Sequence, residues 1–318
     1  MIGFLARRLL LAVPILIGVS LVIFITIKII PGDPVDVLLG PTSTPADRAE
    51  LVHWLGLDRP LPVQYVTWLW HTLRGDFGTS VAQQAPVRSI VLSALGNTLI
   101  LTSAAALIAL VLGMVIGVVT ALRPHGVLAR IGNAFALVSL SLPQYSLGLL
   151  LIIYAAAGTG WFPVSGMYDP NGDGGFADLF NHLVLPAVTA ALVPMGIIAR
   201  MFRSSVLDVM SQDFVEALRA RGLPERTILW HAFHNTLPSL LTVAGLQIGR
   251  LLGGVVFVEA VFSWPGIGGL LFQSISQRDH PVIQAGVLVT AFTFVVLNLA
   301  VDTMHGLIDP RIRSYQEP

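Results

Sequence analysis

No charged residue occurs between Arg88 and Arg123, and five further stretches of the chain are similarly apolar. About 20 apolar residues suffice for a helix to cross the ~30 Å hydrocarbon core of a bilayer. Inside that core every backbone polar group must be bonded internally, so such stretches span the membrane as helices. Only 11% of the 318 residues are charged, whereas soluble proteins typically carry about 25%. The sequence therefore predicts an all-α, polytopic membrane protein.

The apolar stretches predict six transmembrane helices. The first follows two arginines, as a signal peptide does, but its apolar core is too long for one and no small-residue cleavage site ends it. We therefore expect a retained first helix. The predicted spans are 9–30, 97–121, 131–157 with a break at Pro143, 182–203, 239–259 and 282–306.

Polar segments separate these spans and suggest three regions. Residues 1–30 hold the first span, residues 31–96 form an extracytoplasmic cap, and residues 97–318 hold the other five spans. The cap has helical pieces over 46–56 and 62–74, and its Trp54, Trp68 and Trp70 suit the level of the lipid headgroups. Segment 263–281 is too polar and broken to cross.

The basic residues predict the orientation of the chain. The N-terminus and segments 123–130, 200–226 and 311–313 hold 11 of the 18 Lys and Arg, while acids outnumber basic residues on the opposite side. By the positive-inside rule, both termini and the 204–238 loop lie in the cytoplasm.

No constellation for catalysis, metal binding or nucleic-acid binding is evident. The chain has no cysteine, and its zero net charge argues against a nucleic-acid partner. The DPNGDGG run lacks the closing Glu of a calcium loop, and His231 and His234 have no third ligand nearby. A phosphate-binding GxxxxGK[ST] loop is missing as well. We therefore expect neither enzymatic activity nor a cofactor in this chain.

Polar residues within the spans must be paired or face water. They line a translocation path or only bond helices together, and the sequence leaves both alternatives open. The candidates for lining the path are Asn97, Gln144, Gln247, Arg250, Asn298 and Asp302, and Glu259 is a further polar residue within the spans.

Residues 213–238 are the most charged run of the chain and predict a helix, a turn and a second helix. Val215 and Leu218 share one helical face, and Arg219 lies in the last turn, where a cation suits the helix dipole. Gly222 is placed as a C′ glycine, and Pro224 would open the next helix.

Glu216, Ala217 and Leu218, followed after three residues by Gly222 and later by Leu237-Pro238, resemble the EAA loop of bacterial ABC importer permeases. Leu218 replaces the second alanine of that signature, and Leu-Pro lies farther from the glycine. PGDP, FSWPGIGGLL, RDHPVIQAGVL and DPRIR resemble the peptide branch of the family, so the similarity covers the whole chain.

The resemblance implies a type I ABC importer permease fold in the bacterial inner membrane. It also implies a second permease, two cytoplasmic ATPases that bind ATP and magnesium, and an external substrate-binding protein. The EAA loop would dock on an ATPase, with Glu216, Ala217 and Gly222 shaping the turn and with basic residues facing acidic groups: Arg219, Arg221 and Arg226. Peptide is the expected cargo. Nickel chelates, glutathione and haem are alternatives within the family, and an ATP-independent ion-coupled carrier is the alternative outside it.

Overall fold

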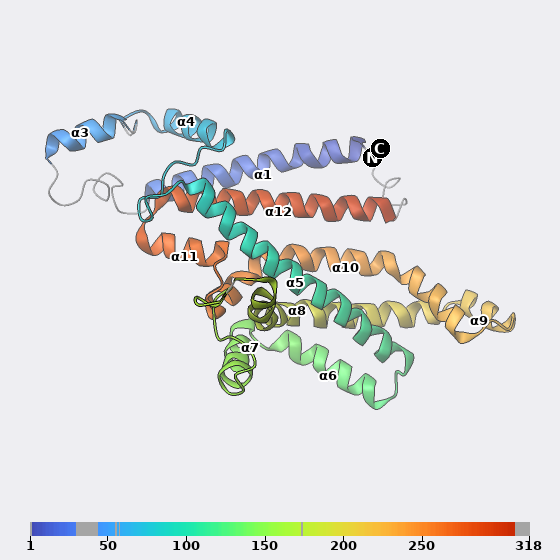
Figure 1. Ribbon diagram of the computed structural model, residues 1–318. Helices are drawn as coiled ribbons and strands as arrows, with labels where there is room; N and C mark the ends of the chain where they lie inside the picture. The colour runs from blue at the N-terminus through green and yellow to red at the C-terminus, as the bar shows by residue number, and fades with distance from the viewer. Residues whose placement is uncertain (1, 30–43, 55, 57, 173, 309–318) are drawn as a thin grey trace. The chain divides into compact units, whose positions relative to one another are not determined.

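The computed structural model of the chain describes residues 2–29, 44–54, 56, 58–172 and 174–308. Its described residues are predominantly helical, and their one β-bridge joins Thr79 to Pro86. Figure 1 shows the helices in chain order: α1 (Ile2–Ile29), α3 (Pro45–Trp54), α4 (Leu61–Leu73), α5 (Val87–Leu122), α6 (Val127–Ser141), α7 (Gln144–Leu151), the π-helix η1 (Ile152–Ala157), α8 (Phe176–Met210), α9 (Asp213–Ala220), α10 (Glu225–Phe262), α11 (Ile267–Gln277) and α12 (His280–Ile308).

Five of the described helices are long and apolar enough to cross a membrane: α1, α5, α8, α10 and α12. Helix α6 and the α7–η1 segment pass the same test only together and are bent by 107° at the break between them. Leu142 there is extended, with ψ 123°, because the ring of Pro143 disfavours helical geometry in the preceding residue. The all-α class and the helix break at Pro143 are confirmed.

Several helices are longer than the predicted spans. Helix α5 begins at Val87, and α10 begins at Glu225 and runs through Pro238 without interruption. The second helix expected in the 213–238 run and the fifth span are therefore one helix. The prediction was wrong on this point because an apolar stretch marks the part of a helix that lies in lipid, and the helix continues beyond that part.

The chain divides into two compact units. The first comprises Asn97–Pro265 with the residues from Leu297 onward, and the second comprises Ile2–Gly96 with Gly266–Val296. In the first unit, α8 is the central helix and packs against α6, α7 and α10. A glycine also allows α5 to approach α8 closely, since a Cβ on Gly113 of α5 would meet Ile198 of α8 at 2.8 Å.

In the second unit, α4 packs on α1. Trp68 lies against a cluster that includes Ile23 and Ile27 of α1, so it is part of the packing. Trp70 is 54% exposed and remains available to a headgroup layer. Of the three cap tryptophans, the side chain of Trp54 lies outside the described part of the structure.

Candidate coupling site and intramembrane polar residues

Helix α9 is a short amphipathic helix between the ends of α8 and α10. Asp213 and Glu216 lie in its first turn, where negative charge suits the helix dipole. Val215 is fully buried, and α9 packs against α10. A buried apolar anchor on one face and charges on the other fix α9 at the surface of the first unit.

The turn after α9 is a Schellman motif. The Gly222 amide donates to the Arg219 carbonyl at 2.9 Å, and the Leu223 amide donates to the Leu218 carbonyl at 3.3 Å. Gly222 has φ +75°, in the left-handed region, and Pro224 is the N-cap of α10. The predicted C′ glycine and the predicted start of the next helix are both confirmed.

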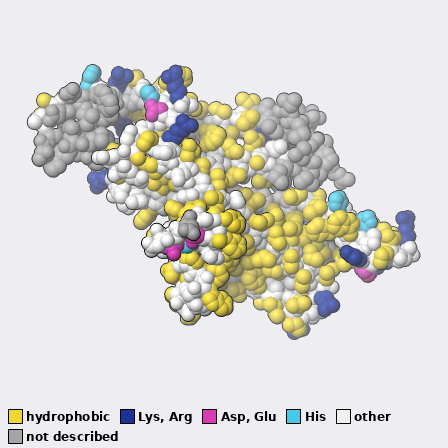
Figure 2. Space-filling model, in the orientation of Figure 1, with side chains coloured by type: hydrophobic (Ala, Val, Ile, Leu, Met, Phe, Trp, Pro, Cys, Tyr) yellow, Lys and Arg dark blue, Asp and Glu magenta, His cyan; other side chains and the backbone are white. Residues whose placement is uncertain are grey.

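All six residues predicted to couple the chain to an ATPase are exposed: Glu216, Ala217, Arg219, Arg221, Gly222 and Arg226. Figure 2 shows basic, acidic and histidine side chains gathered around this end of the first unit, next to a broad hydrophobic surface.

Within this set, Arg219 is already paired inside the turn. Its Nε lies 2.9 Å from Oε1 of Glu225, and that hydrogen bond raises the pKa of the Arg219 guanidinium above its usual value. Arg221 and Arg226 make no ion pair with any described residue. Two of the three arginines therefore present their charge outward without a partner in the described chain.

An aromatic cluster joins α8 to α10. We call α9 and the turn after it, residues 213–224, the elbow. Phe202 of α8 meets Phe233 of α10 edge-on at 5.8 Å between ring centroids, and Trp230 stacks on Phe233 at 6.2 Å. Edge-to-face and offset pairs at these separations are favourable. Sequence reasoning missed this cluster, although the three-residue spacing of Trp230 and Phe233 places both rings on one helical face.

Two of the predicted path residues bond to backbone carbonyls of other elements. Asn97 Nδ2 donates to the Pro265 carbonyl at 2.9 Å, and Gln144 Nε2 lies 3.5 Å from the Ala190 carbonyl. Such bonds are what the helix-bonding alternative expects. For Asn97 and Gln144, a path role remains a prediction.

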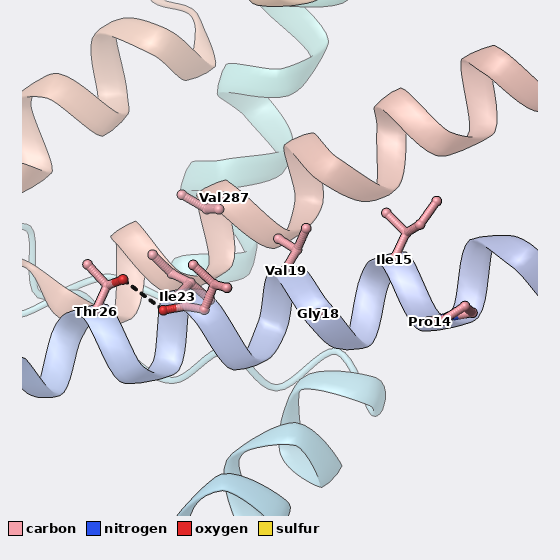
Figure 3. Close-up of a pocket in the computed structure, with 8 residues that line it drawn as sticks. Pro14, Ile15, Gly18, Val19, Ile23, Thr26 and Val287 are labelled. Carbon is pink, nitrogen blue, oxygen red and sulfur yellow. Dashed lines mark hydrogen bonds between the residues drawn. The ribbon is translucent and has the colours of Figure 1, made fainter.

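The other four path candidates lie on α10 and α12. Gln247 is buried while Arg250, three residues later, is exposed, so the two side chains have different surroundings despite their spacing. Asn298 and Asp302 are four residues apart on α12, and both are half-buried. The apolar groove in Figure 3 lies along α1, from Pro14 to Thr26 with Val287, and contains none of the six.

A buried polar cluster sits where α10 ends. Glu259 is 1% exposed and accepts a 2.6 Å hydrogen bond from Thr98 of α5. The backbone amide of Trp264 donates to the Glu259 carbonyl, and its indole N–H donates to the Asn97 carbonyl, both at 2.9 Å. Glu259 was noticed in the sequence, but Thr98 was not, because nothing local marks a threonine as a carboxylate donor.

Several apolar spans, one bent helix pair and an exposed capped turn between two long helices are the features of a polytopic membrane protein. The solved structures of the MetNI methionine ABC transporter in inward-facing conformations match this fold. One match has a TM-score of 0.55 at 20% identity over 69% of this chain and 96% of that chain. The fold is therefore that of a type I ABC importer permease.

Two family models cover most of the sequence. Residues 113–314 match the family described as binding-protein-dependent transport system inner membrane component, and residues 1–102 match its N-terminal model. The chain belongs to this family of inner-membrane permeases.

Full-length relatives support the assignment. The chain is 40% identical to a di/tripeptide transport system permease of Pseudomonas aeruginosa, over 98% of this chain and 99% of that protein. It is 37% identical, with the same coverage, to an oligopeptide transport system permease of Bacillus subtilis. It is also 37% identical, again with that coverage, to a glutathione transport system permease of Salmonella typhi.

Proposed function

We propose that this chain is one of two permease subunits of an ATP-driven importer that carries peptides across the bacterial inner membrane. Its full-length relatives include permeases of dipeptide, tripeptide and oligopeptide transport systems. The excess of basic residues around α9 supports a cytoplasmic location for that helix and both termini. The cap over 31–96 and the 263–281 segment then face the external binding protein.

One observation carries the coupling role of α9. It is joined by short, capped turns to α8 and α10, and α10 runs unbroken for 38 residues from Glu225 to Phe262. At 1.5 Å per residue, such a helix is about 57 Å long and reaches from the elbow through the whole membrane. A displacement of α9 by a partner is therefore transmitted to the spans along one continuous helix.

The ATPases supply the energy, and this chain converts it into movement. ATP and magnesium bind to the partner subunits, while α9 docks on one of them. Arg221 and Arg226 meet acidic groups on the ATPase, and Glu216, Ala217 and Gly222 hold the shape of the turn. Closure of the ATPases then rocks α8 and α10 between inward-facing and outward-facing arrangements.

The test compares two glycines that both have φ in the left-handed region. Gly222 and Gly160 have φ +75° and +69°, and neither would place a Cβ within 4 Å of a neighbouring atom. Both valine variants strain the backbone, but only Gly222→Val changes the elbow. In the reconstituted importer, Gly222→Val and Glu216→Lys should abolish ATP-driven uptake, and Gly160→Val should retain it. Undiminished uptake in both elbow variants would refute the coupling role.

The cargo is tested separately, because one of the full-length relatives is a glutathione transport system permease. Uptake of labelled dipeptides, longer peptides and glutathione by the complete importer distinguishes the substrates. Preference for glutathione, a nickel chelate or haem would replace the peptide assignment and leave the coupling role intact. Uptake by the purified chain alone, driven by a proton gradient, would instead indicate an ion-coupled carrier.

A further inference from the structure

Helix α4 (Leu61–Leu73) has an apolar face that no described residue of the chain covers. Val63, Val66, Trp70 and Leu73 are 43%, 64%, 54% and 74% exposed. Their spacing of three, four and three residues puts all four on one side of the helix. We call this set the α4 stripe.

The opposite side of α4 is held against α1. The hydroxyls of Tyr65 and Ser20 are 2.7 Å apart, and Lys28 Nζ donates to Gln64 Oε1 at 2.7 Å. The rings of Tyr65 and Trp68 both pack on Phe24, at 5.4 and 5.7 Å. The contacts with α1 thus leave the α4 stripe facing outward.

These contacts fix the level of α4 relative to the bilayer. The apolar span of α1 ends at Ile29, and Ser20 precedes that end by nine residues, or about 14 Å of helix. The hydrocarbon core is about 30 Å thick, so the Tyr65 hydroxyl reaches well inside it. Lys28, near the end of the span, reaches the headgroup boundary. Figure 1 shows α4 alongside the C-terminal half of α1.

Cations flank the α4 stripe at both ends. Arg59 precedes the helix, and Arg74 follows it with its guanidinium carbon 4.4 Å from the centroid of the Trp70 ring. Two nearby carboxylates are engaged elsewhere, since Asp58 bonds to His53 at 2.8 Å and Asp76 pairs with His71 at 3.3 Å. An apolar stripe with tryptophan and flanking arginines is typical of a helix that lies in a lipid interface.

We propose that the α4 stripe is a lipid-binding surface, buried in the leaflet that α1 reaches at its C-terminal end. Val66 and Leu73 contact acyl chains, while Trp70 and Arg74 lie at the headgroups and Arg74 binds lipid phosphate. Lipid is the occupant because α1, which holds α4 through Ser20 and Phe24, exposes apolar side chains of its own at the same level, including Leu21, Val22 and Ile25. The inference does not depend on which side of the membrane this leaflet faces.

A lipid-embedded α4 gives the cap a defined role. The helix is fixed to α1 by two side-chain hydrogen bonds and to the leaflet by the α4 stripe, so this part of the cap is held at one level along α1. A partner that approaches the cap then meets a surface whose distance from the membrane does not vary.

The absence of cysteine from the sequence makes the test direct. Nitroxide labels are attached to Val66→Cys and Leu73→Cys, with Thr67→Cys and His71→Cys as controls on the polar side of the same helix. The complete importer is reconstituted in vesicles of phosphatidylcholine and phosphatidylglycerol. The ratio of collision rates with oxygen and with a water-soluble nickel chelate should be severalfold higher at 66 and 73 than at 67 and 71.

Two results would overturn the proposal. Nickel collision rates at 66 and 73 as high as at the controls would place the stripe in water. Low collision rates with both reagents at 66 and 73 would mean that protein covers the stripe.

A second variant tests the phosphate contact. Arg74→Gln should move the label at Leu73→Cys to a different depth, and Arg59→Gln, whose charge does not stack on Trp70, should move it less. An unchanged depth in Arg74→Gln would overturn the assignment of phosphate to Arg74.

Discussion

Thr98 of α5 donates a 2.6 Å hydrogen bond to the carboxylate of Glu259 on α10, and both side chains are buried. The two residues are separated by 161 positions in the sequence. The bond joins two spans of the first unit at the point where α10 ends. A buried carboxylate is costly unless it accepts hydrogen bonds, so this contact has a measurable consequence.

Thr98→Val keeps the shape of the side chain and removes the donor. We expect it to destabilise the protein by about 1–3 kcal/mol, because a buried carboxylate loses one hydrogen bond and the buried position gains no other donor. Thermal unfolding of the purified permease in detergent measures the effect. Thr98→Ser retains the hydroxyl and should be closer to wild type. Equal unfolding temperatures for Thr98→Val and wild type would contradict the prediction.

Gly196 provides a test of helix packing between α6 and α8. A Cβ at this position would overlap the hydroxyl of Ser139, so Gly196→Ala should destabilise the protein, by about 1–3 kcal/mol for an overpacked site. Ser139→Ala removes the overlapping oxygen. The double variant should therefore be more stable than the two single effects added together, which a double-mutant cycle of unfolding free energies measures. Strict additivity would argue against direct contact.

Asp279 organises the loop before α5 in the second unit. Its carboxylate accepts hydrogen bonds from the Ser80 hydroxyl and the Ala82 amide, and its side chain is 2% exposed. Asp279→Leu should release this loop, seen as faster hydrogen exchange at Ala82 and faster proteolysis around it. Asp169→Leu, in a different loop, serves as the control. Unchanged exchange in Asp279→Leu would show that the loop is held by its backbone bonds alone.

The arginines of the elbow should differ in their effect on coupling. Arg219 is paired with Glu225, whereas Arg221 and Arg226 have no ion-pair partner among the described residues. Arg221→Gln and Arg226→Gln should therefore weaken ATPase binding more than Arg219→Gln does, and the difference should shrink at high salt because exposed charges are screened. Co-purification of the ATPases over a range of salt concentrations measures this. The largest loss in Arg219→Gln would contradict the prediction.

Local features of the structure were predicted well because local sequence controls them. Gly222 is in the left-handed region after α9, and Pro143 breaks the third span, as expected. A glycine at C′ and a residue before proline act through their own backbone geometry. The second helix of the 213–238 run and the fifth span were expected as separate elements but are one helix, α10, because hydropathy does not report where a helix continues into water.

The sequence by itself determined the helical class, the apolar spans and the elbow with Gly222 at the end of its helix. Each of these depends on residues that are near one another in the chain. Only the tertiary structure decided that Thr98 donates a hydrogen bond to Glu259 and that Ser80 donates one to Asp279. It also decided that Trp68 packs against α1 while Trp70 stays exposed. These pairings join segments that are far apart in sequence. A hydroxyl or a ring carries no local sign of its partner, so only the packing of the helices selects it.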